Sequence, residues 1–191
     1  MRIDVMTDIE TLGTNSDSTI IQISAIAFNI NTGEYISEFN KIADIALNKT
    51  NNITGGTLIW WLNTNKELLT ELLNEGEGSS EELLQSFNEW LLELSLDGEI
   101  HLWGNGILFD NKMIQHQLES IGLRYPIHYK NDRDVRTIVD LASAKLGITE
   151  KELKDRYIDD SLVHHNAFDD VKYQINLVVG CYNELIKLNK R

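Results

Sequence analysis

The stretch TIIQISAIAFN, from Thr19 to Asn29, decides the fold of this chain. Its β-branched and aromatic residues form a nearly continuous apolar run, which is typical of a central strand buried on both faces of a sheet. Before it, Arg2–Asp8 reads as a short strand; after it, Asn31–Gly33 supplies a turn and Glu34–Ile42 alternates as a strand should. The sequence therefore predicts three antiparallel strands at the N-terminus.

Helical patterns dominate the chain after Ile42. Ser79 and Glu82 form a capping-box signature, and apolar residues then recur on one helix face as far as Leu94. A short strand, Glu99–Trp103, interrupts the helices. This order of elements predicts an α/β fold in a single domain covering residues 1–191. The other helices are expected over 109–121 (ended by Gly122), over 134–146 (ended by Gly147), from 149, and over 167–188 with Asn166 as N-cap.

The composition sets limits on the function. The 191 residues include 17 Lys and Arg against 30 Asp and Glu, which gives a formal net charge of −13. This balance argues against strong nonspecific binding of nucleic acid through a broad basic face. The single cysteine, Cys181, excludes a disulfide within the chain and indicates a reducing compartment, and no signal peptide or membrane span is recognisable. A cytoplasmic protein that binds no membrane is expected.

The first candidate site consists of two acids at the end of the first strand, Asp8 and Glu10. Side chains two positions apart in a strand share a face, and their Cα atoms lie roughly 6.5–7 Å apart, so both carboxylates can bind one hard cation. Thr11-Leu12-Gly13 follows at once, and its small, flexible backbone could approach a ligand closely. A D-x-E sequence also arises by chance on an acidic surface, so the pair alone does not decide between a site and surface charge.

Two further segments place an acid near the start of a helix. In the first, a glycine-rich loop, Gly104–Gly106, leads from a strand to Asp110, which could equally be an ordinary helix cap. In the second, Asn166 as N-cap leaves His165 on the entering loop and Asp170 in the first turns, so that both could face the sheet. A histidine before a helix is more often an ordinary loop residue. Together, however, the three segments would present four acids and one histidine at strand or helix ends, where a cleft would lie at one edge of the sheet.

These motifs resemble those of a known family, the DEDDh 3′→5′ exonucleases of the DnaQ-like group, which have a ribonuclease-H-like fold. The first motif is similar to D-I-E-T-L-G at Asp8, the second to the acid of G-I-L-F-D at Asp110, and the third to H-N-A-F-D-D-V at His165. The third, with its H-x-A-x-x-D form, is the most specific, and the similarity spans nearly the whole chain. T-L-I-W-W (57–61), G-N-G-I-L-F-D (104–110) and N-D-R-D-V-R-T (131–137) further resemble the phage DexA exonucleases and the ribonuclease AS group.

The resemblance implies a mixed central sheet, in which parallel strands join the three antiparallel ones and helices flank both. It also implies hydrolysis of the terminal phosphodiester with two divalent cations, Mg²⁺ or, as a substitute, Mn²⁺. Asp8 would bridge both cations, Glu10 and Asp170 would hold the one on the nucleophile side, and Asp110 would support the other. His165, with an ordinary pKa of about 6.5, would act as general base for the attacking water.

The DexA-like motifs favour the 3′ end of single-stranded DNA as substrate, with release of nucleoside 5′-monophosphates in the cytoplasm of a bacterium or a phage-infected host. Trimming of RNA 3′ ends is an alternative, because no motif shows a contact to a 2′-hydroxyl. A catalytically inactive nucleic-acid-binding module is an alternative of another class, and the complete set of four acids and a histidine argues against it. The H-x-A-x-x-D helix disfavours a ribonuclease-H-type endonuclease. A homodimer is compatible with the sequence but cannot be read from it.

The candidate substrate contacts include two adjacent tryptophans, Trp60 and Trp61. Neighbours on a helix cannot face the same way, so one should lie in the core while the other could stack on the terminal base, and the sequence does not say which. Arg136, three residues after Arg133 at an expected helix start, could reach a phosphate, although the adjacent acids make a surface ion pair at least as reasonable. The other predicted contacts are Thr11, Leu12, Gly13 and Asn105.

Overall fold

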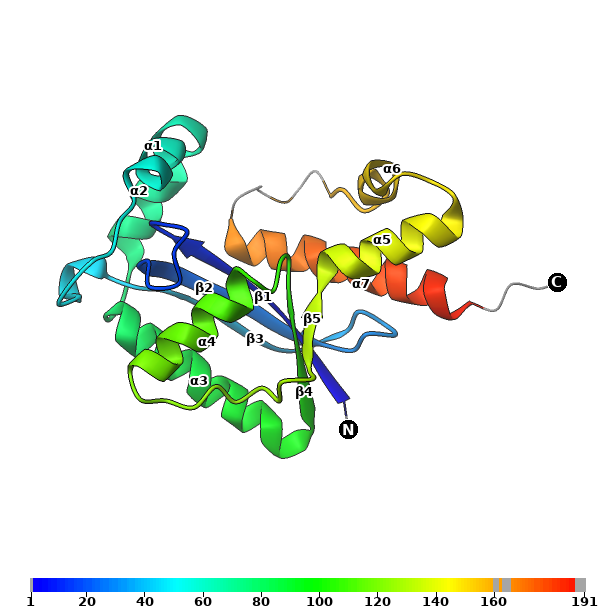
Figure 1. Ribbon diagram of the computed structural model, residues 1–191, viewed down its shortest axis with the longest axis horizontal. Helices are drawn as coiled ribbons and strands as arrows, with labels where there is room; N and C mark the ends of the chain where they lie inside the picture. Colours follow the sequence, from blue (N-terminus) through cyan, green and yellow to red (C-terminus); the bar gives the residue numbers. More distant parts are fainter. Residues whose placement is uncertain (1, 160–161, 163–165, 188–191) are drawn as a thin grey trace.

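A five-stranded mixed sheet forms the centre of the protein in the computed structural model, which describes residues 2–159, 162 and 166–187 (Figure 1). The strand order is β3-β2-β1-β4-β5. β1, β2 and β3 pair antiparallel, whereas β4 is parallel to both β1 and β5. The expected three antiparallel strands and the mixed sheet are therefore confirmed. The strands are β1 Arg2–Thr11, β2 Ile20–Phe28, β3 Tyr35–Ile42, β4 Glu99–Gly104 and β5 Asp132–Asp134.

The predicted central strand lies between two others and is buried along its whole length. Its pairing with β1 places Asp8 opposite Ser24 and Glu10 opposite Gln22, and the register shifts between Glu10 and Thr11. β1 is longer than the sequence pattern indicated, since it continues to Thr11. Both acids of the first motif consequently lie within the strand and on one face of the sheet, because side chains alternate along a strand.

The helices begin and end close to where the local signals predict. Both capping boxes form, at Ser79 with Glu82 and at Thr149 with Glu152, and Asn166 caps the last helix through its side chain. The helix expected over 109–121 begins at Asp110. The helices are α1 Gly55–Thr64, α2 Lys66–Glu75, α3 Ser80–Asp97, α4 Asp110–Ser120, α5 Val135–Leu146, α6 Glu150–Asp155 and α7 Ala167–Ile186, with a 3₁₀ turn at Ile45–Leu47.

One expectation is wrong. Arg133 does not share a helix start with Arg136, because it lies in the three-residue strand β5, whereas Arg136 lies in the first turn of α5. β5 pairs with the end of β4, and Asp134 then caps α5 by accepting a hydrogen bond from the backbone N–H of Thr137. Three residues are too few to show an alternating pattern, so the pairing with β4 makes this strand.

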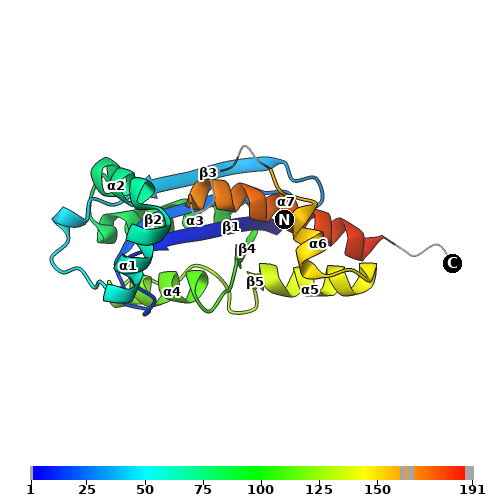
Figure 2. The same cartoon turned by 90° about the horizontal axis from the view of Figure 1, so that it is seen from above.

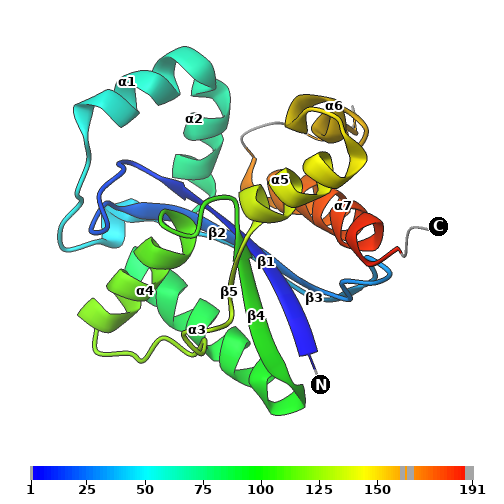
Figure 3. The ribbon, with the colours of Figure 1, turned by 45° about the vertical axis from the view of Figure 1, so that its right-hand side comes forward.

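The helices pack in two groups on opposite sides of the sheet (Figures 1 and 3). One core cluster joins α3 and α4 to the sheet, and a second joins α5 and α7 to Met6, Ile26 and Phe28. A third, smaller cluster holds α1 and α2 against Leu12 and Ile21, beyond the last residues of β1. Figure 2 shows α1 and α2 at the same end of the sheet as the start of α7. Within the described residues, no helix is both long and apolar enough to cross a bilayer.

Candidate active site

Four acidic side chains from three elements approach one another at the end of β1. Asp8 and Glu10 belong to β1, Asp110 is the first residue of α4, and Asp170 lies in the first turn of α7. The pKa of Asp8 is raised by the charges of both Asp110 and Asp170, so Asp8 is within electrostatic reach of both. The structure thus brings together the acids of all three sequence motifs.

Burial and mutual repulsion both oppose ionisation of the two acids on β1. The pKa of Asp8 lies well above its ordinary value, first because of burial and then because of the neighbouring carboxylates. Burial and the charges of Asp8, Asp170 and Asp110, in that order, raise the pKa of Glu10 to about 9. Carboxylates held together in this way are stabilised in the charged form by a nearby positive charge.

Asp110 is set against the sheet and is only 4% exposed. Burial raises its pKa to about 7, while hydrogen bonds from the backbone N–H groups of Asp110 and Ile9 and the positive charge of Arg136 lower it. Phe109 occupies the N-cap position and Asp110 is the first residue of the helix, so Asp110 is not the ordinary N-cap that the sequence allowed. Its carboxylate is instead held beside β1, close to the other acids.

The donor set fits hard divalent cations. Four carboxylates without a thiol among them match the oxygen ligands that Mg²⁺ and Mn²⁺ prefer. In residues 2–159, 162 and 166–187, no three Asp, Glu, His or Cys side chains form a ready-made metal-binding group. The acids are therefore gathered within range of one another without the close geometry of an assembled centre. His165, the predicted general base, lies outside the described residues.

An apolar pocket of about 420 Å³ opens beside Glu10. Trp61 forms part of its wall, is 1% exposed, and donates its indole N–H to the backbone carbonyl oxygen of Thr11 over 2.9 Å. Trp60 also lines the pocket but is 43% exposed. One of the two tryptophans is thus in the core, as the helical spacing requires, and the structure identifies it as Trp61. The remaining lining residues are Ile9, Thr11, Thr14, Gly56, Thr57 and Phe109.

The other predicted substrate contacts are placed differently. Leu12 is buried in the core cluster with α1 and α2, and Gly13 packs tightly against Ser18, so neither lines the apolar pocket. Asn105 is exposed in the loop before α4. Arg136 lies over Gly106 in that loop, whose φ of 121° favours glycine, and acts on the charge of Asp110. Thr11, Trp60 and Arg136 are accordingly nearest to the acids, and all of these binding roles stay predictions.

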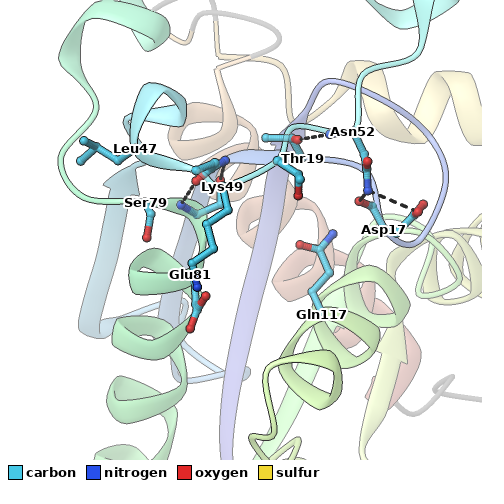
Figure 4. A pocket seen from close by; sticks show the side chains of 11 residues that line it. Asp17, Thr19, Leu47, Lys49, Asn52, Ser79, Glu81 and Gln117 are labelled. Carbon is cyan, nitrogen blue, oxygen red and sulfur yellow. Dashed lines mark hydrogen bonds between the residues drawn. The ribbon is translucent and has the colours of Figure 1, made fainter.

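A second, polar pocket of about 290 Å³ lies on another part of the surface (Figure 4). Asn52 makes hydrogen bonds to two other lining residues. Its backbone N–H donates to Thr19 Oγ1, and its side-chain amide donates to Asp17. Gln117 of α4 faces this pocket and donates to the backbone carbonyl oxygens of Ser16 and Ser18. None of the four acids of the candidate active site lines it. Its polar groups tie the loop after β1 to its neighbours.

Sequence reasoning missed one residue that contacts the acids, Gln174. Its side-chain amide donates a hydrogen bond to Asp8 Oδ1 over 3.1 Å, although the two residues are 166 positions apart. The available signal was the position of Gln174, four residues after Asp170 and therefore on the same face of α7. A polar residue on an otherwise apolar buried stripe marks a position that packing alone does not explain.

Solved structures that share this fold are nucleases. The nuclease domain of 3′hExo, a DEDDh family member bound to rAMP, superposes with a TM-score of 0.66 and 15% sequence identity. The match covers 98% of this chain and 94% of the 3′hExo chain. E. coli exonuclease I in complex with an oligonucleotide superposes with a TM-score of 0.60 and 18% sequence identity. The match covers 93% of this chain and 40% of the exonuclease I chain. The chain therefore has the fold of these nucleases, with its four acids on β1, α4 and α7.

The chain belongs to the family of 3′-5′ exoribonuclease Rv2179c-like domains, whose model matches residues 3–182, and this match places it among the 3′-5′ exonucleases. The exodeoxyribonuclease of Enterobacteria phage T4 is 23% identical over 208 residues, which cover 93% of this chain and 91% of the phage protein. The predicted enzyme class and family are confirmed by these matches. The chain is a 3′-5′ exonuclease that acts on nucleic acid.

Proposed function

We propose that this protein removes nucleoside 5′-monophosphates one at a time from the 3′ end of single-stranded DNA. The observation that carries the proposal is the convergence of Asp8, Glu10, Asp110 and Asp170 beside an apolar pocket. Carboxylates can hold the divalent cations that phosphodiester hydrolysis uses, and an apolar pocket can receive a base. The two features together suit an enzyme that binds a strand end and cuts the bond next to it.

The four acids have distinct roles in this proposal. Two divalent cations, when bound, would activate a water molecule and stabilise the leaving 3′-oxygen. Asp8 would contact both cations, Glu10 and Asp170 would hold the cation on the side of the nucleophile, and Asp110 would support the cation on the side of the leaving group. His165 accepts the proton of the attacking water at its imidazole nitrogen.

The terminal nucleotide is held by contacts that do not read sequence. Trp60, exposed at the pocket, stacks on the terminal base, which contributes about 1–3 kcal/mol per base. Trp61 fixes the wall behind it through its hydrogen bond to Thr11. Arg136, whose charge already acts on Asp110, is placed to attract a phosphate near the scissile bond. Stacking on an apolar wall also answers how a chain with a net charge of −13 binds a polyanion.

RNA is the second candidate substrate, and each choice has its own support. The phage T4 relative, which matches over most of both chains, is described as an exodeoxyribonuclease and favours DNA. The family to which the chain belongs is described as exoribonuclease and favours RNA. A 2′-hydroxyl offers both a donor and an acceptor, so the choice depends on polar atoms close to the ribose of the bound nucleotide.

The test is digestion of matched single-stranded DNA and RNA oligonucleotides, labelled at the 5′ end, with Mg²⁺ or Mn²⁺. The expected result is a ladder that shortens from the 3′ end, is lost on chelation, and is faster on DNA. D8A and H165A should abolish the ladder, whereas the exposed acid Asp140 on α5 supplies a matched control in D140A, which should leave it intact. A faster ladder on RNA would establish the second candidate, and no metal-dependent cleavage of either would overturn the proposal.

A further inference from the structure

The buried stripe of α7 is apolar with one exception near its start. Gln174 is 4% exposed and carries the one amide side chain among the buried residues of this helix. It lies one helical turn after Asp170, so the two side chains point to the same side of α7. Its buried neighbours along the helix are Ala167, Val171, Ile175, Leu177, Val178 and Cys181.

Gln174 connects α7 to Asp8 on β1. Its Nε2 donates to Asp8 Oδ1 over 3.1 Å, and within the described residues it is the one side chain that donates a hydrogen bond to Asp8. The bond therefore fixes one oxygen of the Asp8 carboxylate toward the helix that also carries Asp170.

The amide oxygen of Gln174, Oε1, is buried and makes no hydrogen bond among the described residues. A buried polar atom left without a partner costs about 1–3 kcal/mol, so an apolar side chain of similar shape would suit folding better. Turning the amide round would not help, because Oε1 would then face the carboxylate of Asp8 and repel it. Packing does not account for a glutamine here, whereas orienting Asp8 does.

We propose that Gln174 is a positioning residue of the active site, which holds the carboxylate of Asp8 in the orientation that binds the catalytic cations. The inference rests on the proposed function, because it assigns Asp8 to cation binding. Residues that hydrogen-bond to a metal ligand fix its orientation and typically change metal affinity by about 10–100-fold when they are replaced. Gln174 does not touch substrate and acts through Asp8.

The variant that tests this is Q174M, which keeps the length and bulk of the side chain and removes the donor. Mn²⁺ binding is measured directly, from the free ion detected by electron paramagnetic resonance, and does not depend on turnover. The expected result is about 10–100-fold weaker binding than wild type. In the absence of divalent cations, the thermal unfolding midpoint of Q174M should be equal to or above that of wild type, because the unpartnered Oε1 is gone.

The matched control is N88L on α3. Asn88 is also a buried amide whose Oδ1 lacks a partner within the described residues, but it lies on a helix that packs against the opposite side of the sheet. The same amide-to-apolar change there should leave Mn²⁺ affinity at the wild-type value. In nuclease assays, raising the Mn²⁺ concentration should restore most of the rate of Q174M, since the acids themselves are intact. A merely structural glutamine would not shift the metal concentration needed for half-maximal rate.

The outcomes separate this inference from the proposed function. Wild-type Mn²⁺ affinity in Q174M, in a folded protein, overturns the positioning role whatever the enzyme cleaves. Weaker binding in Q174M with unchanged binding in N88L supports it. If the wild-type protein binds Mn²⁺ through Asp8, as shown by loss of binding in D8A, but cleaves no nucleic acid, the proposed function fails while the role of Gln174 in holding Asp8 is still decided by the binding data.

Discussion

The indole N–H of Trp61 on α1 is hydrogen-bonded to the backbone carbonyl oxygen of Thr11 at the end of β1. This bond fixes the helix against the strand that carries Asp8 and Glu10, one residue from the second acid. It also turns Trp60, whose ring meets that of Trp61 edge to face at a centroid distance of 5.2 Å, toward the apolar pocket. The two neighbouring tryptophans thus differ in position: Trp61 is buried in the pocket wall, and Trp60 is exposed where a ligand could contact it.

Replacing each tryptophan should therefore give different results. W60A should raise KM for single-stranded oligonucleotides by roughly 5–150-fold, which corresponds to losing about 1–3 kcal/mol of stacking, with little change in the unfolding midpoint. W61F should lower the free energy of unfolding by about 1–3 kcal/mol, because it leaves the Thr11 carbonyl oxygen without its donor. Steady-state kinetics and thermal unfolding of the two variants check this pair of expectations. Equal effects of both on KM, with no loss of stability, would contradict it.

Burial of Glu10 and Asp110, with repulsion from neighbouring carboxylates as a smaller cause, should make the metal-free protein less stable as the pH rises. Folding raises the pKa of Glu10 from about 4.5 to about 9 and that of Asp110 from about 3.8 to about 7. The folded state therefore binds more protons than the unfolded state between these values, so the free energy of unfolding decreases as the pH increases through them. In EDTA, the unfolding midpoint should fall between pH 5 and pH 9, and excess Mg²⁺ should reduce that fall.

The control for this pH dependence is E10Q, which replaces an acid that must take up a proton on folding with a neutral amide of nearly the same volume. Its midpoint in EDTA at pH 8 should exceed that of wild type by several degrees, because about 1 kcal/mol corresponds to roughly 2–4 °C at this chain length. D140N, which changes an exposed acid on α5, should follow wild type. A midpoint that is flat or rises between pH 5 and pH 9 without metal would show that folding does not raise the pKa values of these acids.

Much of the fold could be predicted from sequence because its signals are local. The β-branched run of β2, the capping boxes at Ser79 and Thr149, and the cap at Asn166 each depend on residues within a few positions of one another. The acids could be found for a similar reason, since Asp8 and Glu10 share a strand face by alternation. β5 could not, because its three residues form a strand only through pairing with β4.

Features that depend on contacts between distant residues could not be predicted from the sequence. Helical spacing requires Trp60 and Trp61 to diverge, but which of them is buried depends on Thr11, which lies 50 positions earlier. Leu12 belongs to the first motif, yet it packs into the core, just after the register of β1 shifts. The contact of Gln174 with Asp8 joins opposite ends of the chain. The placement of His165 stays a prediction, since it lies outside the described residues.

Gly180 should be a helix glycine that alanine cannot replace. Alanine within a helix is normally favoured over glycine by about 1 kcal/mol. At Gly180 of α7, however, a Cβ would overlap the ring and hydroxyl of Tyr157, which packs against the core cluster of α5 and α7. G180A should therefore lower the free energy of unfolding, by about 1–3 kcal/mol for an overpacked contact.

The matched variant is G56A in α1, where a Cβ meets no atom within 4 Å. This change should raise the free energy of unfolding by about 0.5–1 kcal/mol, so the same substitution has opposite signs at the two helices. Chemical denaturation of both variants measures the difference. Stabilisation by G180A would mean that Tyr157 moves aside at no cost and does not hold α6 against α7.

Binding of single-stranded nucleic acid should depend only weakly on monovalent salt. Each phosphate neutralised by a basic side chain contributes about −0.7 to the slope of log K against log salt concentration for single strands. Within the described residues, Arg136 is the basic side chain whose charge acts on the acids of the site, and the chain carries a net charge of −13. One or two such contacts predict a slope of about −1. The slope is measured with H165A, whose four acids are intact, as its affinity for a fluorescent oligonucleotide at fixed Mg²⁺ and about 50–200 mM NaCl. The further change R136Q should bring this slope closer to zero by about 0.7. A slope several times steeper would point to a basic binding surface instead of stacking and cation-mediated contacts.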